Sequence, residues 1–210
     1  MQTPEKPFVI ENGQRIFNFR KTLIYIEYLG KRQYGENFKI YREDTKVIYK
    51  LISYMIHEQN QCKNHNIDLN KGILLIGPVG SGKTSIMNIL RQFLFREEYY
   101  LIKSARDIAF EYQKEGIDTI QKYGKQQRAL CIDDLGVENN TKFYGNECNT
   151  IAEVLLQRYE LLTNFKIKTH ATTNLNADEL EELYGNRVRS RLRSMFNLIS
   201  FPKDTVDKRK

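Results

Sequence analysis

Apolar positions follow two different spacings along this chain. In the first part they recur at helical intervals, so residues 17–29 predict a helix that ends at Gly30. Residues 45–59 predict a second helix with one broad apolar face. After the polar turn NHNIDLNKG, the run ILLIG is short and wholly apolar, which is typical of a parallel strand buried on both faces. The pattern therefore indicates a helical N-terminal part followed by an α/β domain.

Strands and helices are expected to alternate through the rest of the chain. Helices are expected at residues 84–95, 105 to about 123, and 147–163, with two shorter ones in NADELEELYG and NRVRSRLRSM. The other four strands are expected at residues 99–102 and in ALCIDDLG, FKIKTHATTN and FNLISF. This alternation implies right-handed crossovers and a three-layer α/β fold around a parallel five-stranded sheet.

The length of 210 residues suits one domain with an appendage. We divide the chain into a helical N-terminal extension at residues 1–40, an α/β core at residues 41–202 and a basic tail at residues 203–210. The extension is a candidate partner-binding region, although its aromatic residues are equally suited to packing against the core. No apolar run approaches the roughly 20 residues of a membrane span, and the sequence MQTPEKPFVIENGQRI contains no secretory h-region.

Cysteine spacing and net charge bear on compartment and partners. Cys62, Cys131 and Cys148 form no CxxC pair, so we expect reduced thiols in a cytoplasmic protein that does not interact with membranes. The net charge of +7 favours polyanionic partners. Many basic proteins bind no nucleic acid, however, so charge alone leaves DNA binding open.

The stretch GPVGSGKT matches the phosphate-loop pattern G-x-x-x-x-G-K-[ST] between a predicted strand and a predicted helix. Its glycines allow successive backbone N–H groups to surround a phosphate, and the following helix adds its N-terminal dipole. In such loops the lysine bridges the β- and γ-phosphates and the hydroxyl ligates Mg²⁺, so we expect ATP and Mg²⁺ here. The expected nucleotide-binding residues are Gly77, Val79, Gly80, Ser81, Gly82, Lys83, Thr84 and Ser85.

Polar residues end two of the later strands. Asp133 and Asp134 follow the strand in RALCIDDLG, where the first acid suits a Mg²⁺ partner and the second suits orientation or deprotonation of an attacking water. Asn174 ends the next strand, where its amide has the right position to hold that water in line. The alternatives are a solvated acidic turn and a helix cap, respectively.

A basic helix, YGNRVRSRLRSMF, lies late in the chain. It places Arg187 and Arg191 on one side, with Arg189 and Arg193 elsewhere. Three roles remain open for this helix: binding nucleic acid, forming a solvated face, or presenting an arginine to the γ-phosphate of a neighbouring subunit.

The order of these motifs resembles that of AAA+ ATPases, and most closely the DnaC/IstB-like family of bacterial helicase loaders and transposition helper ATPases. The resemblance covers roughly residues 38–201 and rests on GPVGSGKT, CIDDLG, ATTNL and the G-x-R-x-x-S-R-L pattern that begins at Gly185. It implies ATP binding, head-to-tail homo-oligomers in the ATP-bound state, contact with DNA, often single-stranded, and action on a replicative helicase or a transposase.

The resemblance also implies individual roles in catalysis. By position, Lys83 would bind the phosphates, and Thr84 and Asp133 would hold Mg²⁺. Asp134 would act on the attacking water, and Asn174 would be the sensor residue. Arg187 corresponds best to the arginine finger, and Arg191 is the second candidate.

The chain departs from the wider AAA+ pattern in two respects. Asp134 stands where most of that superfamily has glutamate, so slow turnover is expected. The chain also lacks the C-terminal lid of other AAA+ proteins, which leaves the adenine pocket less enclosed. Backbone near residues 38–41 is expected to cover the base.

The resemblance places a nucleic-acid-contacting helix in SARDIAFEYQKEGIDTIQKYGKQQRA. This segment is either that contact or an ordinary solvated helix whose acids dilute its charge. The residues of interest are Arg106, Lys114, Lys122, Lys125 and Arg128, with Tyr112 and Tyr123 as candidates for base stacking.

Three functions remain in competition at this point. The first is a DNA-dependent ATPase that loads a helicase or assists a transposase, and it is the one we expect. The second is a small-molecule kinase that uses the same phosphate loop. The third is a nucleotide-gated scaffold with little turnover.

Overall fold

The computed structural model describes residues 3–11, 14–138, 141–143 and 146–209, and its centre is a parallel sheet of five strands. The strand order is β4–β5–β8–β3–β9, and every neighbouring pair is parallel, which confirms the expected sheet. These strands are β3 (Gly72–Ile76), β4 (Leu101–Ser104), β5 (Leu130–Leu135), β8 (Thr169–Thr173) and β9 (Phe196–Ser200).

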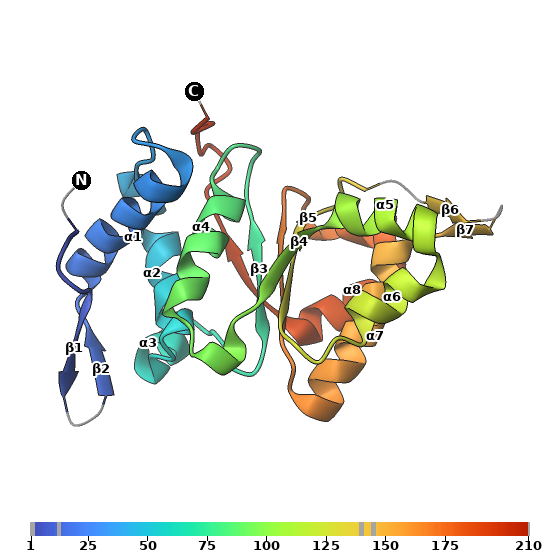
Figure 1. Ribbon diagram of the computed structural model, residues 1–210, viewed down its shortest axis with the longest axis horizontal. Coiled ribbons are helices and arrows are strands. Elements are labelled where there is room, and N and C mark those ends of the chain that lie inside the picture. Colours follow the sequence, from blue (N-terminus) through green and yellow to red (C-terminus); the bar gives the residue numbers. More distant parts are fainter. Residues whose placement is uncertain (1–2, 12–13, 139–140, 144–145, 210) are drawn as a thin grey trace.

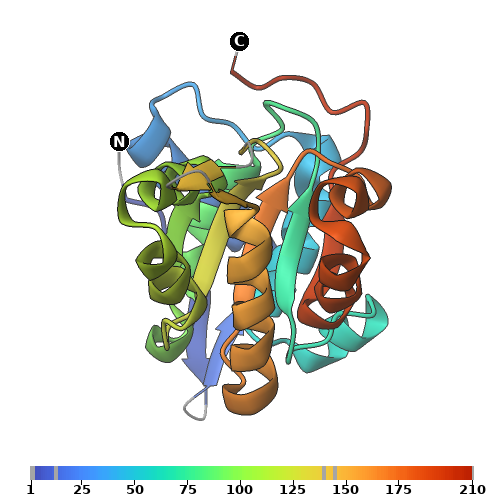
Figure 2. The same ribbon diagram turned by 90° about the vertical axis from the view of Figure 1, so that its right-hand side faces the viewer.

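Helices cover both faces of the sheet (Figure 1). On one side lie α1 (Phe19–Tyr34), α2 (Thr45–Met55), α3 (Gln59–Asn64) and α4 (Lys83–Leu90). On the other lie α5 (Ala105–Glu115), α6 (Ile117–Gly124), α7 (Thr150–Phe165) and α8 (Ala177–Met195). Figure 2 shows α7 across the middle of the second face, between the α5–α6 pair and α8.

The sheet separates two apolar cores, and successive side chains of each buried strand point into one core and then the other. In β3, Ile73 and Leu75 join the core formed with α1, α2 and α4, while Leu74 joins the core under α5 to α8. In β5, Cys131 belongs to the first core and Ile132 to the second. Strands with both faces covered read as continuous apolar runs, which is why ILLI and LCI were recognisable.

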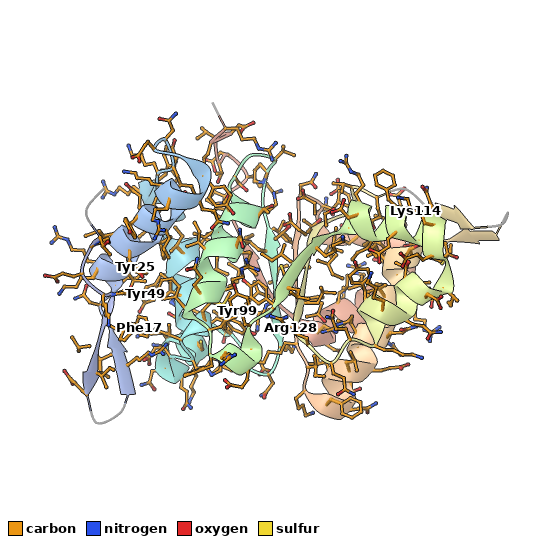
Figure 3. All side chains as sticks on the ribbon, in the orientation of Figure 1. Phe17, Tyr25, Tyr49, Tyr99, Lys114 and Arg128 are labelled. Carbon is orange, nitrogen blue, oxygen red and sulfur yellow. The ribbon has the colours of Figure 1, made fainter. Side chains whose placement is uncertain are left out.

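The N-terminal part contains a hairpin that the helical pattern did not predict. Strands β1 (Phe8–Glu11) and β2 (Gln14–Phe17) pair antiparallel. The rings of Phe8 and Phe17 lie 5.1 Å apart, and Phe17 also lies 6.2 Å from Phe93 in the short 3₁₀ helix η2 (Arg91–Phe93). Figure 3 labels Phe17 beside Tyr25 of α1. Aromatic contacts therefore fix the hairpin to the first helical layer.

Helix α1 passes through Gly30 and ends at Tyr34, so the expected end at Gly30 was wrong. Gly30 is buried, and a Cβ there would lie 2.1 Å from Cδ1 of Phe38. The glycine therefore allows the close approach of an aromatic ring and does not stop the helix. Asn18 caps the N-terminus by accepting the N–H of Lys21 at 3.0 Å.

Four expected helices have different bounds in the structure. The helix expected at residues 84–95 is α4, which ends at Leu90. Residues 45–59 form α2 and then a turn at His57, whose φ is 56°, before α3 begins. Residues 105–123 form α5 and α6, divided at Gly116 with φ 61°. Helix α7 starts at Thr150, because the preceding strands β6 (Thr141–Phe143) and β7 (Asn146–Cys148) form a hairpin.

Three further features complete the chain. The two predicted late helices form one helix, α8, which is kinked at Gly185 with φ 80° and ψ 163°. Short 3₁₀ helices η1 (Arg42–Asp44) and η3 (Arg96–Glu98) connect the larger elements. Within the described ranges, no helix combines the length and apolar character that a bilayer span requires.

Candidate nucleotide-binding site

The phosphate loop connects β3 to α4 at the carboxyl edge of the sheet. Gly80 and Gly82 have φ values of 79° and 88°, which residues that carry a Cβ rarely adopt. The N–H of Gly77 donates to the carbonyl of Thr173 at 3.2 Å, which ties the loop to β8. The predicted strand–loop–helix context of GPVGSGKT is therefore present.

A cavity of about 450 Å³ lies against this loop. Most of the expected nucleotide-binding residues, 80–85, line it, together with Asp134. Gly77 and Val79 do not line it. Gly77 packs under the loop against Phe201, and Val79 is 58% exposed.

Lys83 is buried at the base of the loop. Its Nζ donates to the carbonyls of Gly77 and Pro78, both at 2.9 Å. Burial lowers the pKa of the Lys83 ammonium, and so does the charge of Arg209, while the carboxylates of Asp134 and Asp133 oppose that shift. The side chain is thus held inside the loop by two backbone carbonyls, while the residue also lines the cavity.

Thr84 and Asp133 meet at the end of the loop. The hydroxyl of Thr84 lies 2.9 Å from each oxygen of the Asp133 carboxylate. Burial raises the pKa of Asp133, and the hydrogen bonds from Thr172 and Thr84 oppose that effect. The two residues predicted for the metal are therefore in direct contact.

The donor set at Thr84 and Asp133 fits Mg²⁺. Nucleotide-bound Mg²⁺ takes hard oxygen ligands, few of them from protein, and completes its shell with phosphate and water oxygens. Within the parts of the chain that the structure describes, no three His, Cys, Asp or Glu side chains gather into an all-protein metal site. A hydroxyl beside one carboxylate is the arrangement that a shared, nucleotide-dependent metal requires.

Thr172 belongs to the site, although the sequence analysis did not name it. Its hydroxyl donates to Asp133 Oδ1 at 2.7 Å and accepts the backbone N–H of Asp134 at 2.9 Å. Strand β8 lies between β3 and β5, which puts Thr172 beside both acids. The available signal was the fully buried strand THATT, whose hydroxyls each need a partner.

Asp134 is directed into the cavity by an irregularity in β5. The pairing register with β8 shifts between Ile132 and Leu135, and Asp134 has a φ of 56°. Such bulges turn a side chain out of the strand alternation and occur next to functional sites. As a result Asp133 contacts Thr84 while Asp134 lines the cavity.

Asn174 follows the last residue of β8, at the same edge of the sheet as the loop. Its side chain is exposed. Thr173 fixes the backbone before it, since its hydroxyl donates to the carbonyl of Leu135 at 2.7 Å and accepts the N–H of Leu175 at 3.0 Å. The cap of α8 is Asn176, so capping does not account for Asn174.

The arginines of α8 differ in their surroundings. Arg189 is paired with Asp178 and Glu181. The Arg191 guanidinium lies 5.2 Å from the ring centre of Tyr159. Arg187 is exposed, as an arginine that reaches another subunit must be. Arg187 and Arg191 therefore differ in their surroundings, and neither lines the cavity.

A buried contact connects α8 to the segment after Asp134. The hydroxyl of Tyr184 donates to the carboxylate of Glu138, whose other oxygen accepts the N–H of Gly136 at 2.9 Å. Burial raises the pKa of Glu138, and the hydrogen bond from Tyr184 opposes this. Tyr184 immediately precedes the kink at Gly185 in α8. The segment that follows Asp134 is therefore in contact with α8 just before its arginines.

The segment that was expected to cover the base also lines the cavity. Residues 38–41 line the cavity along with Tyr34 and Ile48. Two residues from the basic tail, Lys208 and Arg209, also line it. The tail therefore reaches the site, which the sequence pattern did not indicate.

The proposed nucleic-acid segment needs one correction. Tyr112 and Tyr123 are buried in the core under α5 and α6, so neither offers a face for base stacking. Arg128 lies at the amino end of β5, away from the phosphate loop, where its Nε donates to the carbonyl of Tyr99 at 3.3 Å. Figure 3 labels Arg128 and Tyr99 next to each other, well apart from Lys114 on α5.

Several solved structures share the fold of this chain. A crystal structure of the DnaC helicase loader has a TM-score of 0.57 and 19% identity, over 82% of this chain and 99% of that one. The two chains therefore share one fold. DnaI has a TM-score of 0.54 and 18% identity, over 78% of this chain and 87% of that one.

A third neighbour is AMPPCP-bound DnaA from Aquifex aeolicus, with a TM-score of 0.51 and 20% identity over 82% of this chain. This chain covers 51% of that DnaA chain. No protein-family model matches the sequence, and neither does any curated protein. The expected resemblance to DnaC-like proteins is confirmed at the level of the fold.

Proposed function

We propose that the protein is an ATPase that binds MgATP and acts on DNA as a helicase loader in replication or as a transposition helper. The observation that carries the proposal is the contact of Thr84 with Asp133 at the end of a phosphate loop, with Asp134 directed into the adjoining cavity. The similar solved structures, of a helicase loader and of an AMPPCP-bound DnaA, favour the replication role.

The residues of the cavity divide the work of binding. The N–H groups of the loop and the N-terminus of α4 hold the phosphates, with Lys83 supplying a compensating positive charge. Thr84 and Asp133 hold Mg²⁺, which neutralises charge that develops on the phosphates. Residues 38–41 cover the base.

Hydrolysis depends on the acid and amide at the ends of β5 and β8. Asp134 accepts a hydrogen bond or the proton of the attacking water, and Asn174 orients that water. Arg187 of one subunit completes the site of the next in an ATP-dependent head-to-tail assembly, with Arg191 as the second candidate. Because Asp134 is shorter than glutamate, turnover is slow and depends on assembly.

The surface of α5 is the part of the protein that we propose contacts single-stranded DNA. Arg106, Phe110 and Lys114 lie at intervals of four residues on one exposed side, and the Arg106 guanidinium lies 5.8 Å from the ring centre of Phe110. A cation next to an exposed aromatic ring suits a phosphate and its stacked base. We propose that the client protein is a replicative helicase or a transposase and that the protein is cytoplasmic.

Phosphate release from ATP tests this function. The assay compares wild type with Asp134→Asn in Mg²⁺, with and without single-stranded DNA, and uses Asp118→Asn, an exposed acid on α6, as the control. Wild type and Asp118→Asn are expected to release phosphate faster with DNA, whereas Asp134→Asn binds ATP without turnover. ADP formation that requires a small-molecule acceptor would instead indicate a kinase, and binding without turnover in wild type a scaffold.

A further inference from the structure

The last described residues, 202–209, run across the phosphate loop, and we call them the C-terminal strap. The strap begins after β9, where the N–H of Phe201 donates to the carbonyl of Ile76 at 2.8 Å. It ends on the loop itself, where the N–H of Lys208 donates to the carbonyl of Gly80 at 3.1 Å. Figures 1 and 2 show the C-terminal end at the same edge of the molecule as the β3–α4 loop.

Lys208 fastens the strap to two walls of the cavity. Its Nζ donates to the carbonyl of Ser81 at 2.8 Å and to Asp44 Oδ2 at 2.5 Å. The same ammonium lies 4.9 Å from the ring centre of Phe201 and 5.5 Å from that of Tyr41. Asp44 is 3% exposed, and its other oxygen has no hydrogen-bond partner among the described residues. A buried carboxylate held by one ammonium fixes the position of that ammonium.

The strap lies directly against the loop backbone. A Cβ on Gly80 would be 2.1 Å from Asp207 Oδ1, so the Asp207 side chain lies against the bare Cα of this glycine. The same Asp207 oxygen accepts the N–H of Arg209 at 2.9 Å, which fixes the turn that leads into Arg209. The backbone of Arg209 is therefore positioned by the two residues that precede it, Asp207 and Lys208.

Arg209 faces the same cavity as Lys83. Both residues line it, and the charge of Arg209 is one cause of the lowered pKa of Lys83. Two cations that face one cavity repel each other, and an anion placed between them removes that repulsion. A guanidinium also presents its N–H donors in a plane that matches phosphate oxygens. Asp134 also lines the cavity, but Lys83 and Arg209 together outweigh its single negative charge, so the site suits an anionic ligand.

We propose that Arg209 is a phosphate-binding residue of the nucleotide site and that Lys208 is the positioning residue that holds it over the loop. This inference rests on the proposed function, because it takes the anion to be the phosphate chain of ATP. The strap then supplies, from the same chain, a further cation to the cavity that adjoins the loop.

Equilibrium titration with ATP in Mg²⁺ tests the inference. Arg209→Ala is expected to raise the Kd for ATP about tenfold, since a charge-assisted hydrogen bond is lost. Arg209→Lys should recover part of that loss, and the difference from wild type should shrink as salt is raised. Lys203→Ala is the matched control: it removes one charge from the same strap, is exposed and does not line the cavity.

A second set of measurements separates phosphate binding from a structural role. Arg209 is exposed, so the melting temperature of nucleotide-free Arg209→Ala should equal that of wild type. Lys208→Met should raise the Kd for ATP and also lower the melting temperature, because it leaves Asp44 buried without its partner.

Two further outcomes would contradict either the strap inference or the proposed function. If wild type binds ATP and Arg209→Ala binds it equally well or more tightly, the strap inference is wrong while the proposed function stands. If wild type does not bind ATP, the proposed function is wrong and the inference is lost with it.

Discussion

The hydroxyl of Thr172 donates a hydrogen bond to Asp133, with 2.7 Å between Oγ1 and Oδ1. Both side chains are buried, and the same hydroxyl accepts the backbone N–H of Asp134 at 2.9 Å. One side chain on β8 therefore fixes the carboxylate at the phosphate loop and the backbone that carries the second acid. No role for Thr172 follows from the phosphate-loop pattern, so its importance is a prediction of the geometry.

Thr172→Val keeps the shape of the side chain and removes both hydrogen bonds. We expect phosphate release to fall by about tenfold or more, because Asp133 keeps only its contact with Thr84 and the N–H of Asp134 loses the hydroxyl to which it donates, so both acids are held less firmly. The affinity for ATP should change little, since Thr172 does not line the cavity.

Thr169→Val is the matched control for that change, because Thr169 is a buried threonine of the same strand. Its hydroxyl accepts the Nε–H of Arg158 at 2.8 Å and does not contact Asp133. It should lower stability without a comparable loss of turnover. Equal losses of turnover in the two variants would show that the contact with Asp133 has no special part in hydrolysis.

Arg187→Ala should retain ATP binding and lose turnover by roughly 10³-fold, as expected for an arginine that stabilises the transition state in a neighbouring subunit. Arg193→Ala provides the control, because it removes an exposed arginine from the same helix. Steady-state phosphate release and nucleotide titration together give both quantities.

Mixing inactive variants tests whether the site is shared between subunits. Arg187→Ala lacks the donated arginine and Asp134→Asn lacks the acid, so a mixed assembly contains some interfaces with both groups intact. Activity should return over a range of mixing ratios. A mixture that stays inactive at every ratio argues that each site is complete within one chain.

His170 makes stability sensitive to acid. The ring is buried, its Nδ1 accepts the N–H of Ile73 at 3.2 Å, and it lies 4.6 Å from the ring of Tyr100. Burial lowers the pKa of His170 from 6.5 to about 3, with smaller contributions in the same direction from Lys168 and Arg158 and an opposing one from Glu98. The folded protein therefore keeps this histidine neutral.

Between pH 6.5 and about 3 the unfolded chain binds a proton that folded His170 does not, so the free energy of unfolding falls as pH falls. From pH 7 to 5 this contributes a loss of about 2 kcal/mol. His170→Asn keeps an acceptor for Ile73 and removes the titration. Urea unfolding at the two pH values should show a smaller loss in the variant, and an equal loss would contradict the assignment.

The sequence predicted the sheet and the loop because each has a strong local signature. The apolar runs in β3 and β5 are readable since both faces are buried, and the glycines of the loop meet a backbone requirement that few other residues satisfy. Asp133 beside Thr84 followed from the rule that ligands bind at the carboxyl ends of parallel strands.

What the sequence did not predict depends on contacts between distant segments. Thr172 reaches Asp133 because β8 lies between β5 and β3, and strand order is not written in the local pattern. The approach of Arg209 to the loop depends on the course of the strap after β9. Tyr112 and Tyr123 looked available for stacking, but their helical side turns toward the core.

The central claim is that the phosphate loop binds MgATP. Equilibrium titration of wild type and Lys83→Ala with a fluorescent ATP analogue, in Mg²⁺ and in EDTA, tests it most directly. Wild type should bind the analogue more tightly with Mg²⁺ than without, and Lys83→Ala should bind at least about tenfold more weakly, because a buried charge-assisted contact is lost. Absence of binding by wild type, or equal binding by Lys83→Ala, would contradict the account.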